Sequence, residues 1–352
     1  MGVLTSKPLQ RADTPFTSER KKHFEKLRRE NVPRYLFRAW SSKSGGGPER
    51  VINSKTQVVP RLFLPANSYR AREFYALTER EALDMATRHY TYSYDVISGF
   101  SSWSASLHLV LCYAQSMVDR GFRDVHVSVM DTQDLDYEVL VWQCAHLLGS
   151  GQHEFLAYGP VQGRGYRAVR YSVLVLQGIY GLLPQLQDGS YRSQATLFQF
   201  GYGIRSQTFK KAIQPVTLEQ LETAGRIARM FGPQIFPVLT ALLCLVPRPW
   251  LRSRSGITFT LREQIKCSIE RAGALHILKG LKPELWHKSG YVQAKDFPDV
   301  QQWIRLQRVL VEEYGLHEAN IDTVVVFQGR CQRSLYHVEG AIENSTWALR
   351  TH

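Results

Sequence analysis

An arginine inside an aromatic segment is the first feature of this sequence that could carry chemistry. Arg38 lies in Leu-Phe-Arg-Ala-Trp-Ser (36–41), where a buried guanidinium would need a partner. Its planar fork of donors suits a phosphate group. An arginine can also extend its charged end to solvent, so this segment alone is compatible with an anion-binding residue or a surface residue.

Hydroxyl side chains alternate in a second segment, Phe-Ser-Ser-Trp-Ser-Ala-Ser-Leu (100–107). Ser102, Ser104 and Ser106 would share one face of an extended chain. A helix is predicted to begin here, and a serine at its start can serve as the N-cap. Ser104 or Ser106 could fill that role, whereas Ser102 lies too far upstream and is the candidate functional hydroxyl.

A carboxylate and an amide begin a third segment. Gln152 and Glu154 lie two residues apart at the start of a predicted strand, so their side chains would project to the same side. Such a pair could meet a sugar or a cationic centre. Similar pairs occur on exposed strands, so this segment indicates a site only together with the other two.

Several motifs with known chemistry are absent. The chain has no Walker A sequence, no Gly-x-Gly-x-x-Gly opening a helix, no His-Glu-x-x-His, no Gly-x-Ser-x-Gly and no protein-kinase set. Its 11 histidines lack metal-ligand spacing, so no metal is expected. Its 5 cysteines form no Cys-x-x-Cys, which favours a reducing compartment over a zinc module or a disulfide scaffold.

Composition and patterning predict an α+β protein. The chain has 352 residues, of which 44% are hydrophobic and 21% charged, as is typical of globular proteins. Residues 31–180 alternate short strands and helices, and residues 205–352 are predicted to form a mainly helical domain that buttresses the first or binds a partner. Residues 181–204 are expected to link the two domains.

Individual elements follow from local signals. Capping boxes at Thr78–Glu81 and Thr217–Gln220 open two predicted helices. The apolar stretch 235–246 is too short to cross a membrane and predicts a buried helix. Further predicted elements are a helix at 132–148, a strand at 166–176 and a helix at 298–314.

In this order, the three segments resemble the ADP-ribosyltransferase superfamily, in its cholera-toxin-like branch, over about residues 33–175. The segment 36–41 is similar to the toxin-like Leu-Tyr-Arg-Ala-Asp-Ser, and residues 102–104 are similar to its Ser-Thr-Ser. Gln152-His153-Glu154 resembles the acidic turn, in which Glu or Gln stands two residues before a glutamate. The Ala-x-Gly that follows in those proteins recurs as Ala157-Tyr158-Gly159.

The sequence is also similar to a domain of filamentous fungi. The shared features are Leu-Phe-Arg-Ala-Trp-Ser, a Gly-rich loop, Ser-x-Phe-x-Ser-Trp-x-x-Ser-Leu at 98–107 and a late Glu-Phe-Leu at 154–156. Two residues depart from the toxin-like pattern. Trp103 replaces the threonine between the serines, and Trp40 replaces the acidic residue that supports the arginine. Either change could preserve the fold while turnover is lost.

The resemblance implies a split mixed β-sheet and an activity on NAD, as an ADP-ribosyltransferase or an NAD glycohydrolase. In that chemistry a carboxylate stabilises the oxocarbenium-like state that forms when the nicotinamide–ribose bond breaks, a role that would fall to Glu154. Ser102 would hold the Glu154 side chain in position. Gln152 would orient the acceptor, which stays open between protein and nucleic acid.

The NAD-binding residues implied by the resemblance are Arg38, which would grip the pyrophosphate, together with Trp103 and Ser104. NAD would be the substrate, and no metal would take part. The alternative is a catalytically inactive relative that binds a nucleotide or a protein partner. A third interpretation is a nucleic-acid-binding protein driven by its basic N-terminus.

The net charge of +13 favours polyanionic partners. Residues 1–30 are predicted to form a basic flexible arm, densest between Arg20 and Arg29. This run is compatible with a solvated helix, a nuclear import signal, nucleic-acid contact or an anionic membrane surface.

We expect an intracellular protein, cytoplasmic or nuclear, because the sequence begins without a secretory signal. Met1-Gly2-Val3-Leu4-Thr5-Ser6 matches the N-myristoylation pattern. One acyl chain binds membranes only marginally, so the basic run would have to act as a second signal.

Overall fold

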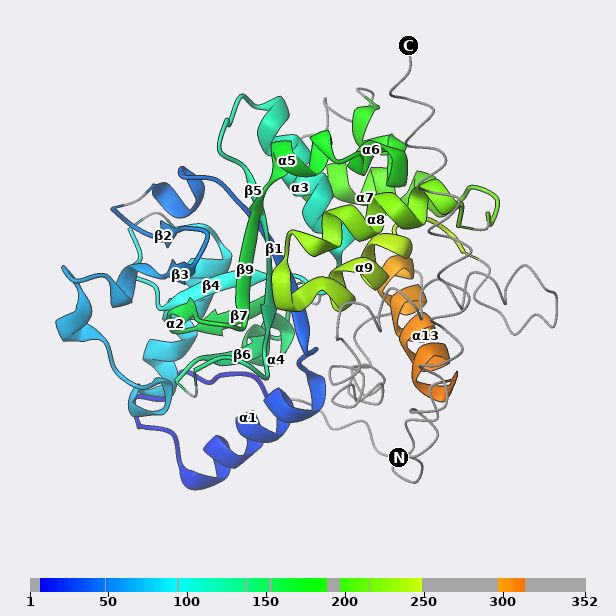
Figure 1. The fold of residues 1–352 in the computed structure, drawn as a ribbon. Helices are drawn as coiled ribbons and strands as arrows, with labels where there is room; N and C mark the ends of the chain where they lie inside the picture. Colours follow the sequence, from blue (N-terminus) through cyan, green and yellow to red (C-terminus); the bar gives the residue numbers. More distant parts are fainter. Residues whose placement is uncertain are drawn as a thin grey trace, which may run out of the picture. The chain divides into compact units, whose positions relative to one another are not determined.

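The computed structural model describes residues 7–47, 49–93, 95–136, 138–151, 154–188, 197–214, 216–248 and 297–313. They form the α+β structure that the sequence predicts, with small sheets and helices in the N-terminal part and mostly helices after residue 197 (Figure 1). The described residues up to 248, with 297–305, belong to one compact unit, and 306–313 belong to a second. Within the described part, no helix is long and apolar enough to cross a membrane.

Strands in the described part pair in three small antiparallel sheets. In order across each sheet, the strands are β1 (Tyr35–Trp40), β5 (His126–Asp131) and β9 (Tyr166–Arg170); β2 (Ile52–Asn53), β3 (Gln57–Val59) and β8 (Val161–Gln162); and β4 (Phe100–Trp103), β7 (Phe155–Tyr158) and β6 (Leu140–Gln143). The first and third sheets are joined where Phe37 and Ser104 exchange two backbone hydrogen bonds of 2.7 and 2.8 Å.

The helices of the described part cover these sheets and continue beyond them (Figure 1). They are α1 (Ser18–Asn31), α2 (Glu79–Tyr90), α3 (Leu107–Asp119), α4 (Cys144–Leu148), α5 (Tyr171–Leu176), α6 (Ile179–Leu182), α7 (Leu197–Thr208), α8 (Leu218–Arg229), α9 (Ile235–Leu243) and α13 (Pro298–Glu313). Both predicted capping boxes are formed, at Thr78 and Thr217. The helices predicted at 235–246 and 298–314 are confirmed as α9 and α13.

Two predicted elements are wrong. The strand predicted at 166–176 ends at Arg170, and α5 follows, because the buried Tyr171 donates its hydroxyl to Gln115 of α3 at 2.9 Å. This tertiary contact overrides the β-branched propensity of the segment. The helix predicted at 132–148 is instead strand β6 followed by the short α4, because β6 completes the sheet beside β7.

The predicted linker also contains structure. Residues 197–204 of it belong to α7, which packs against α3. The contact is close at Gly201, where a Cβ atom would lie 2.5 Å from Leu109 Cδ1. The helical region therefore begins within the segment that the sequence assigned to the linker.

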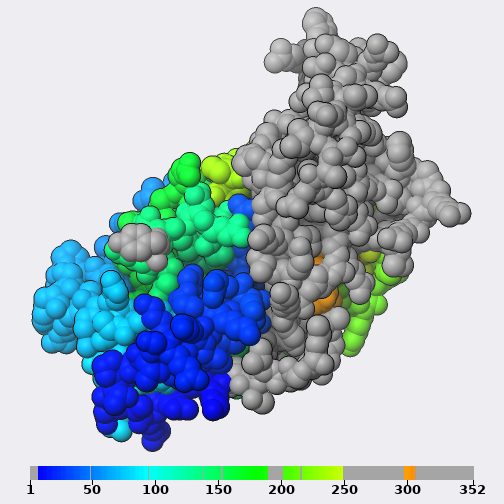
Figure 2. All heavy atoms as spheres, turned by 90° about the horizontal axis from the view of Figure 1, so that it is seen from below, coloured from blue at the N-terminus to red at the C-terminus, as the bar shows by residue number. Residues whose placement is uncertain are grey.

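The N-terminal segment is not a free arm over residues 7–30, which corrects that prediction. Helix α1 buries Phe24 and Leu27 on its inner face, and the Trp142 indole donates to the Phe24 carbonyl at 3.1 Å. Arg20 forms a buried ion pair of 2.8 Å with Glu79. In Figure 2 the N-terminal residues, in dark blue, form one continuous surface with their lighter blue neighbours.

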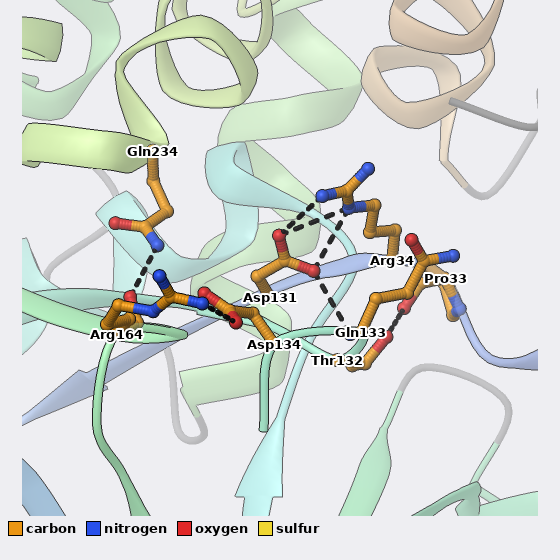
Figure 3. A network of polar contacts seen from close by, with 8 residues as sticks. All are labelled: Pro33, Arg34, Asp131, Thr132, Gln133, Asp134, Arg164 and Gln234. Carbon is orange, nitrogen blue, oxygen red and sulfur yellow. Dashed lines mark hydrogen bonds and ion pairs between the residues drawn. The ribbon is translucent and has the colours of Figure 1, made fainter. Parts of the chain in front are cut away.

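A charged network holds the start of β1 against the end of β5 (Figure 3). The guanidinium of Arg34 donates to both carboxylate oxygens of Asp131 at 3.0–3.1 Å, and Thr132 N–H donates to the Arg34 carbonyl at 2.7 Å. Asp131 Oδ1 also accepts from Gln133 N–H at 3.0 Å. This pairing fixes the register of β1, in which Arg38 lies opposite Ser128.

Replacing Arg34 by Met should lower the free energy of unfolding by about 3 kcal/mol, because it leaves the Asp131 carboxylate in a largely buried site without its cation. The matched control is Arg164→Met, which breaks the exposed pair between Arg164 and Asp134 and should cost less than about 1 kcal/mol. Urea unfolding followed by tryptophan fluorescence measures both. Equal losses would contradict the role assigned to the buried pair.

Candidate functional site

The Arg38 side chain projects from β1 near the place where the sheet of β1 joins the sheet of β4. Its Nη1 donates to the Ser102 carbonyl at 2.9 Å, and its Nη2 donates to Asn53 Oδ1 at 3.3 Å. Its Nε–H is buried and has no partner among the described residues. Because buried donors are nearly always satisfied, this Nε–H is a candidate donor for a bound ligand.

Ser102 and Glu154 approach one another through the β4–β7 pair. In the register of these strands, Ser102 lies opposite Leu156 and Trp103 lies opposite Phe155, so Glu154 immediately precedes the paired residues. Its carbonyl accepts from Cys144 N–H at 2.8 Å, and its own N–H donates to Gly151 at 3.2 Å. Both sides of the Glu154 backbone are therefore fixed.

The electrostatics of Glu154 couple it to the other two residues. Burial raises the pKa of the Glu154 carboxyl, whereas a hydrogen bond with Ser102 and the positive charge of Arg38 act to lower it. In the same way, burial lowers the pKa of Arg38, and the charge of Glu154 acts to raise it. The structure thus brings Arg38, Ser102 and Glu154 together, although 116 positions separate the first from the last in the sequence.

Trp103 and Ser104, which the resemblance implies bind NAD, are both buried and contact other residues of the chain. The Trp103 side chain is buried on the face of β4 opposite to Ser102, and its indole donates to Ser101 Oγ at 2.9 Å. Ser104 is 7% exposed, and its Oγ accepts from Ser106 N–H at 3.1 Å. Ser104 therefore belongs to the junction between the sheets. Gln152 lies outside the described residues.

His89, at the end of α2, is a member of the site that sequence analysis missed. Its Nε2 lies 3.0 Å from Ser102 Oγ, and its Nδ1 lies 3.1 Å from Ser98 Oγ. Ser98 Oγ already accepts from Phe100 N–H at 3.0 Å. If the Ser98 hydroxyl donates to Nδ1, the Nε2–H donates to Ser102, whose own hydroxyl is then free to donate to Glu154.

His89 is held neutral. Burial lowers its pKa to about 3, with a further contribution from the charge of Arg38. A neutral ring can donate at one nitrogen and accept at the other, as the two serine contacts require. A single histidine at a helix end has no sequence signal for such a role, because its partners come from other elements.

The arrangement suits a ligand with an anionic part and a cationic or electron-poor part. Arg38 offers the donor, and Glu154 offers a carboxylate whose position is set by Ser102. Among the described residues, no three His, Cys, Asp or Glu side chains are grouped so as to hold a metal ion.

These residues lie in an α+β domain whose pattern recurs in other proteins. Residues 31–180, from β1 through β9, match the family model of a domain of unknown function, DUF7587. The match includes Arg38, Ser102 and Glu154 and carries no assignment to a superfamily. No curated protein and no solved structure matches the chain.

The lowered pKa of His89 predicts a specific dependence of stability on pH. The stability linked to the neutral ring is present above the ordinary pKa of 6.5 and is lost as the pH falls toward about 3, because only the unfolded chain takes up the proton in that interval. Between pH 7 and pH 4, the wild type should lose about 3 kcal/mol more stability than His89→Gln.

Urea unfolding of both proteins at the two pH values measures this difference. The other histidines are common to both chains and cancel in the comparison. A loss of stability that is the same in the two proteins would show that the His89 ring titrates normally in the folded state.

Proposed function

We propose that the site formed by Arg38, Ser102 and Glu154 binds NAD and cleaves its nicotinamide–ribose bond. Nicotinamide leaves with the electron pair of the broken C–N bond. The ribose carbon then forms a bond to an oxygen or nitrogen of the acceptor, which releases a proton, or to water. We base the proposal on the Arg38–Ser102 hydrogen bond of 2.9 Å and on the β4–β7 register, which bring an arginine, a serine and a glutamate to one place.

Glu154 would stabilise the positive charge that develops on the ribose as nicotinamide departs. Only the ionised carboxylate can do so, and burial opposes ionisation. The hydrogen bond from Ser102 and the charge of Arg38 both favour the ionised form, so the neighbours of Glu154 are those that this role requires.

Arg38 would hold the pyrophosphate through the donors that remain after its contacts with Ser102 and Asn53. In the toxin-like pattern an acidic residue at position 40 supports the arginine, and here Trp40 stacks on His126 instead, at 4.1 Å between ring centroids. The Ser102 carbonyl and the Asn53 amide provide that support in this chain. The tryptophan at position 40 is therefore compatible with an Arg38 that binds the pyrophosphate.

The buried position of Trp103 bears on the alternative of an inactive relative. Its indole lies on the other face of β4 and does not occupy the side where Ser102 meets Glu154. We therefore favour turnover over a nucleotide- or protein-binding module without activity. Gln152 remains the residue expected to orient the acceptor, whether protein or nucleic acid.

The location we infer is cytoplasmic or nuclear, with association to an anionic membrane surface through the N-terminal segment. Lys22, Lys26 and Arg29 are exposed on the outer side of α1, at the i, i+4 and i+7 spacing of one helix face. Phe24 and Leu27 are buried beneath them, so the helix docks through charge alone. Acylation of Gly2 would supply the second attachment.

Replacing Glu154 by Gln should reduce nicotinamide release at least about a hundredfold, because it removes the charge that the oxocarbenium-like state requires, an effect of about 3 kcal/mol. Arg38→Lys should mainly weaken NAD binding, by about tenfold, because lysine lacks the bidentate fork. Labelled NAD is the substrate, with free nicotinamide and labelled macromolecule scored separately.

The control is Glu219→Gln, an exposed carboxylate on α8, which should release nicotinamide at the wild-type rate. Unchanged release in Glu154→Gln would remove Glu154 from the mechanism. A wild type that binds NAD and releases no nicotinamide would favour the inactive binding module.

Replacing Lys22, Lys26 and Arg29 together by Gln should weaken binding to vesicles that contain anionic lipid by about a hundredfold, at about 1 kcal/mol for each charge. Lys211→Gln, at an exposed site after α7, should change it little. Co-sedimentation of acylated and Gly2→Ala protein separates the two signals. Equal binding of the triple variant and the wild type would contradict the role of this helix face.

A further inference from the structure

The end of α2 places a tyrosine where helices favour glycine. Tyr92 N–H donates to the His89 carbonyl at 3.1 Å and Ser93 N–H donates to the Arg88 carbonyl at 2.9 Å, which is the hydrogen-bond pair of a Schellman motif. Tyr92 is the left-handed residue of that motif, with φ of 56°, and no other non-glycine residue of the described part has a positive φ. An aromatic residue is strained in this conformation.

Packing does not explain the tyrosine. The residue is 76% exposed, so its ring adds little buried apolar area that could offset the strain. Strained residues that persist without such a reason concentrate at functional sites. We therefore infer the role of Tyr92 from the residues that surround it in the fold.

Tyr92 stands at the candidate site. It follows His89, whose ring contacts Ser102, by three residues. Burial and the charge of Glu154 raise the pKa of the Tyr92 phenol, whereas the charge of Arg38 acts to lower it. Tyr92 is thus close enough to Glu154 and Arg38 for their charges to act on its phenol.

A second tyrosine, Tyr90, packs on Gly151, close to the backbone of Glu154. A Cβ atom at Gly151 would lie 3.1 Å from the ring of Tyr90, so that ring packs directly on the glycine to which Glu154 N–H donates. The charge of Glu154 acts on the Tyr90 hydroxyl as well. Tyr90 is thus engaged in packing against Gly151, whereas Tyr92 is largely exposed to solvent.

We propose that Tyr92 contacts the ligand directly, as an aromatic platform on which a planar, positively charged ring stacks beside the Glu154 carboxylate. This inference rests on the proposed function, in which that ring is the nicotinamide of NAD. An aromatic face attracts a cation, and a neighbouring carboxylate adds to the attraction. Nicotinamide becomes neutral when its bond to ribose breaks, so the platform holds the substrate more strongly than the leaving group.

The test uses 1-methylnicotinamide, a planar cation without ribose or phosphate, titrated into the full chain by calorimetry. Tyr92→Gly should bind it about tenfold more weakly than the wild type. The same variant should unfold at a higher urea concentration, because glycine relieves the left-handed strain. Tyr92→Phe keeps the aromatic face and should bind within about threefold of the wild type.

Tyr69→Gly is the matched control. Tyr69 is 75% exposed and has no positive φ. That substitution should leave binding unchanged and lower the urea midpoint. Tyr92→Gly protein that binds the cation as the wild type does, or a wild type that fails to bind it, would overturn the proposal. If the cation binds as expected while the wild type cleaves no NAD, the platform stands and the proposed cleavage is wrong.

Discussion

Two backbone hydrogen bonds between Phe37 and Ser104 hold the candidate site together. Each residue donates to the other, at 2.7 and 2.8 Å, and this exchange joins the sheet of β1 to the sheet of β4. Arg38 follows Phe37, and Ser102 lies two residues before Ser104. The junction therefore places the Arg38 guanidinium within hydrogen-bond distance of the Ser102 carbonyl. The β4–β7 pairing then brings in Glu154. A shift of one residue at either place would turn these side chains to the opposite face.

The site consists of connected, partly buried polar groups, and each group restricts the orientation of the next. A neutral His89 between two serines orients the Ser102 hydroxyl, and that hydroxyl in turn favours the ionised Glu154. Such a network is costly unless nearly every member is satisfied. Among these groups, the Nε–H of Arg38 has no partner in the described part, and under the proposed function a ligand would supply its acceptor.

The three segments that carry the site were predictable because each combines unusual residue types at a fixed spacing, and the α+β class followed from the change in patterning along the chain. The contacts of Trp103 and Ser104 were not, because they depend on the tertiary structure: the Trp103 indole donates to Ser101, and Ser104 pairs with Phe37 of another sheet. His89 and Tyr92 give no local signal at all, since their importance comes from partners on other elements. The prediction of a flexible N-terminal arm was wrong for a similar reason. The many charged residues of this segment gave no indication that Phe24 and Leu27 are buried against other elements.

A crystal structure of the chain with a non-cleavable NAD analogue would test whether Arg38, Ser102 and Glu154 form an NAD site. We expect the pyrophosphate to lie on the Arg38 guanidinium and the Glu154 carboxylate, hydrogen-bonded to Ser102, to face the ribose carbon bonded to nicotinamide. An analogue bound elsewhere, or a Glu154 side chain turned away from both Ser102 and the ribose, would contradict this expectation.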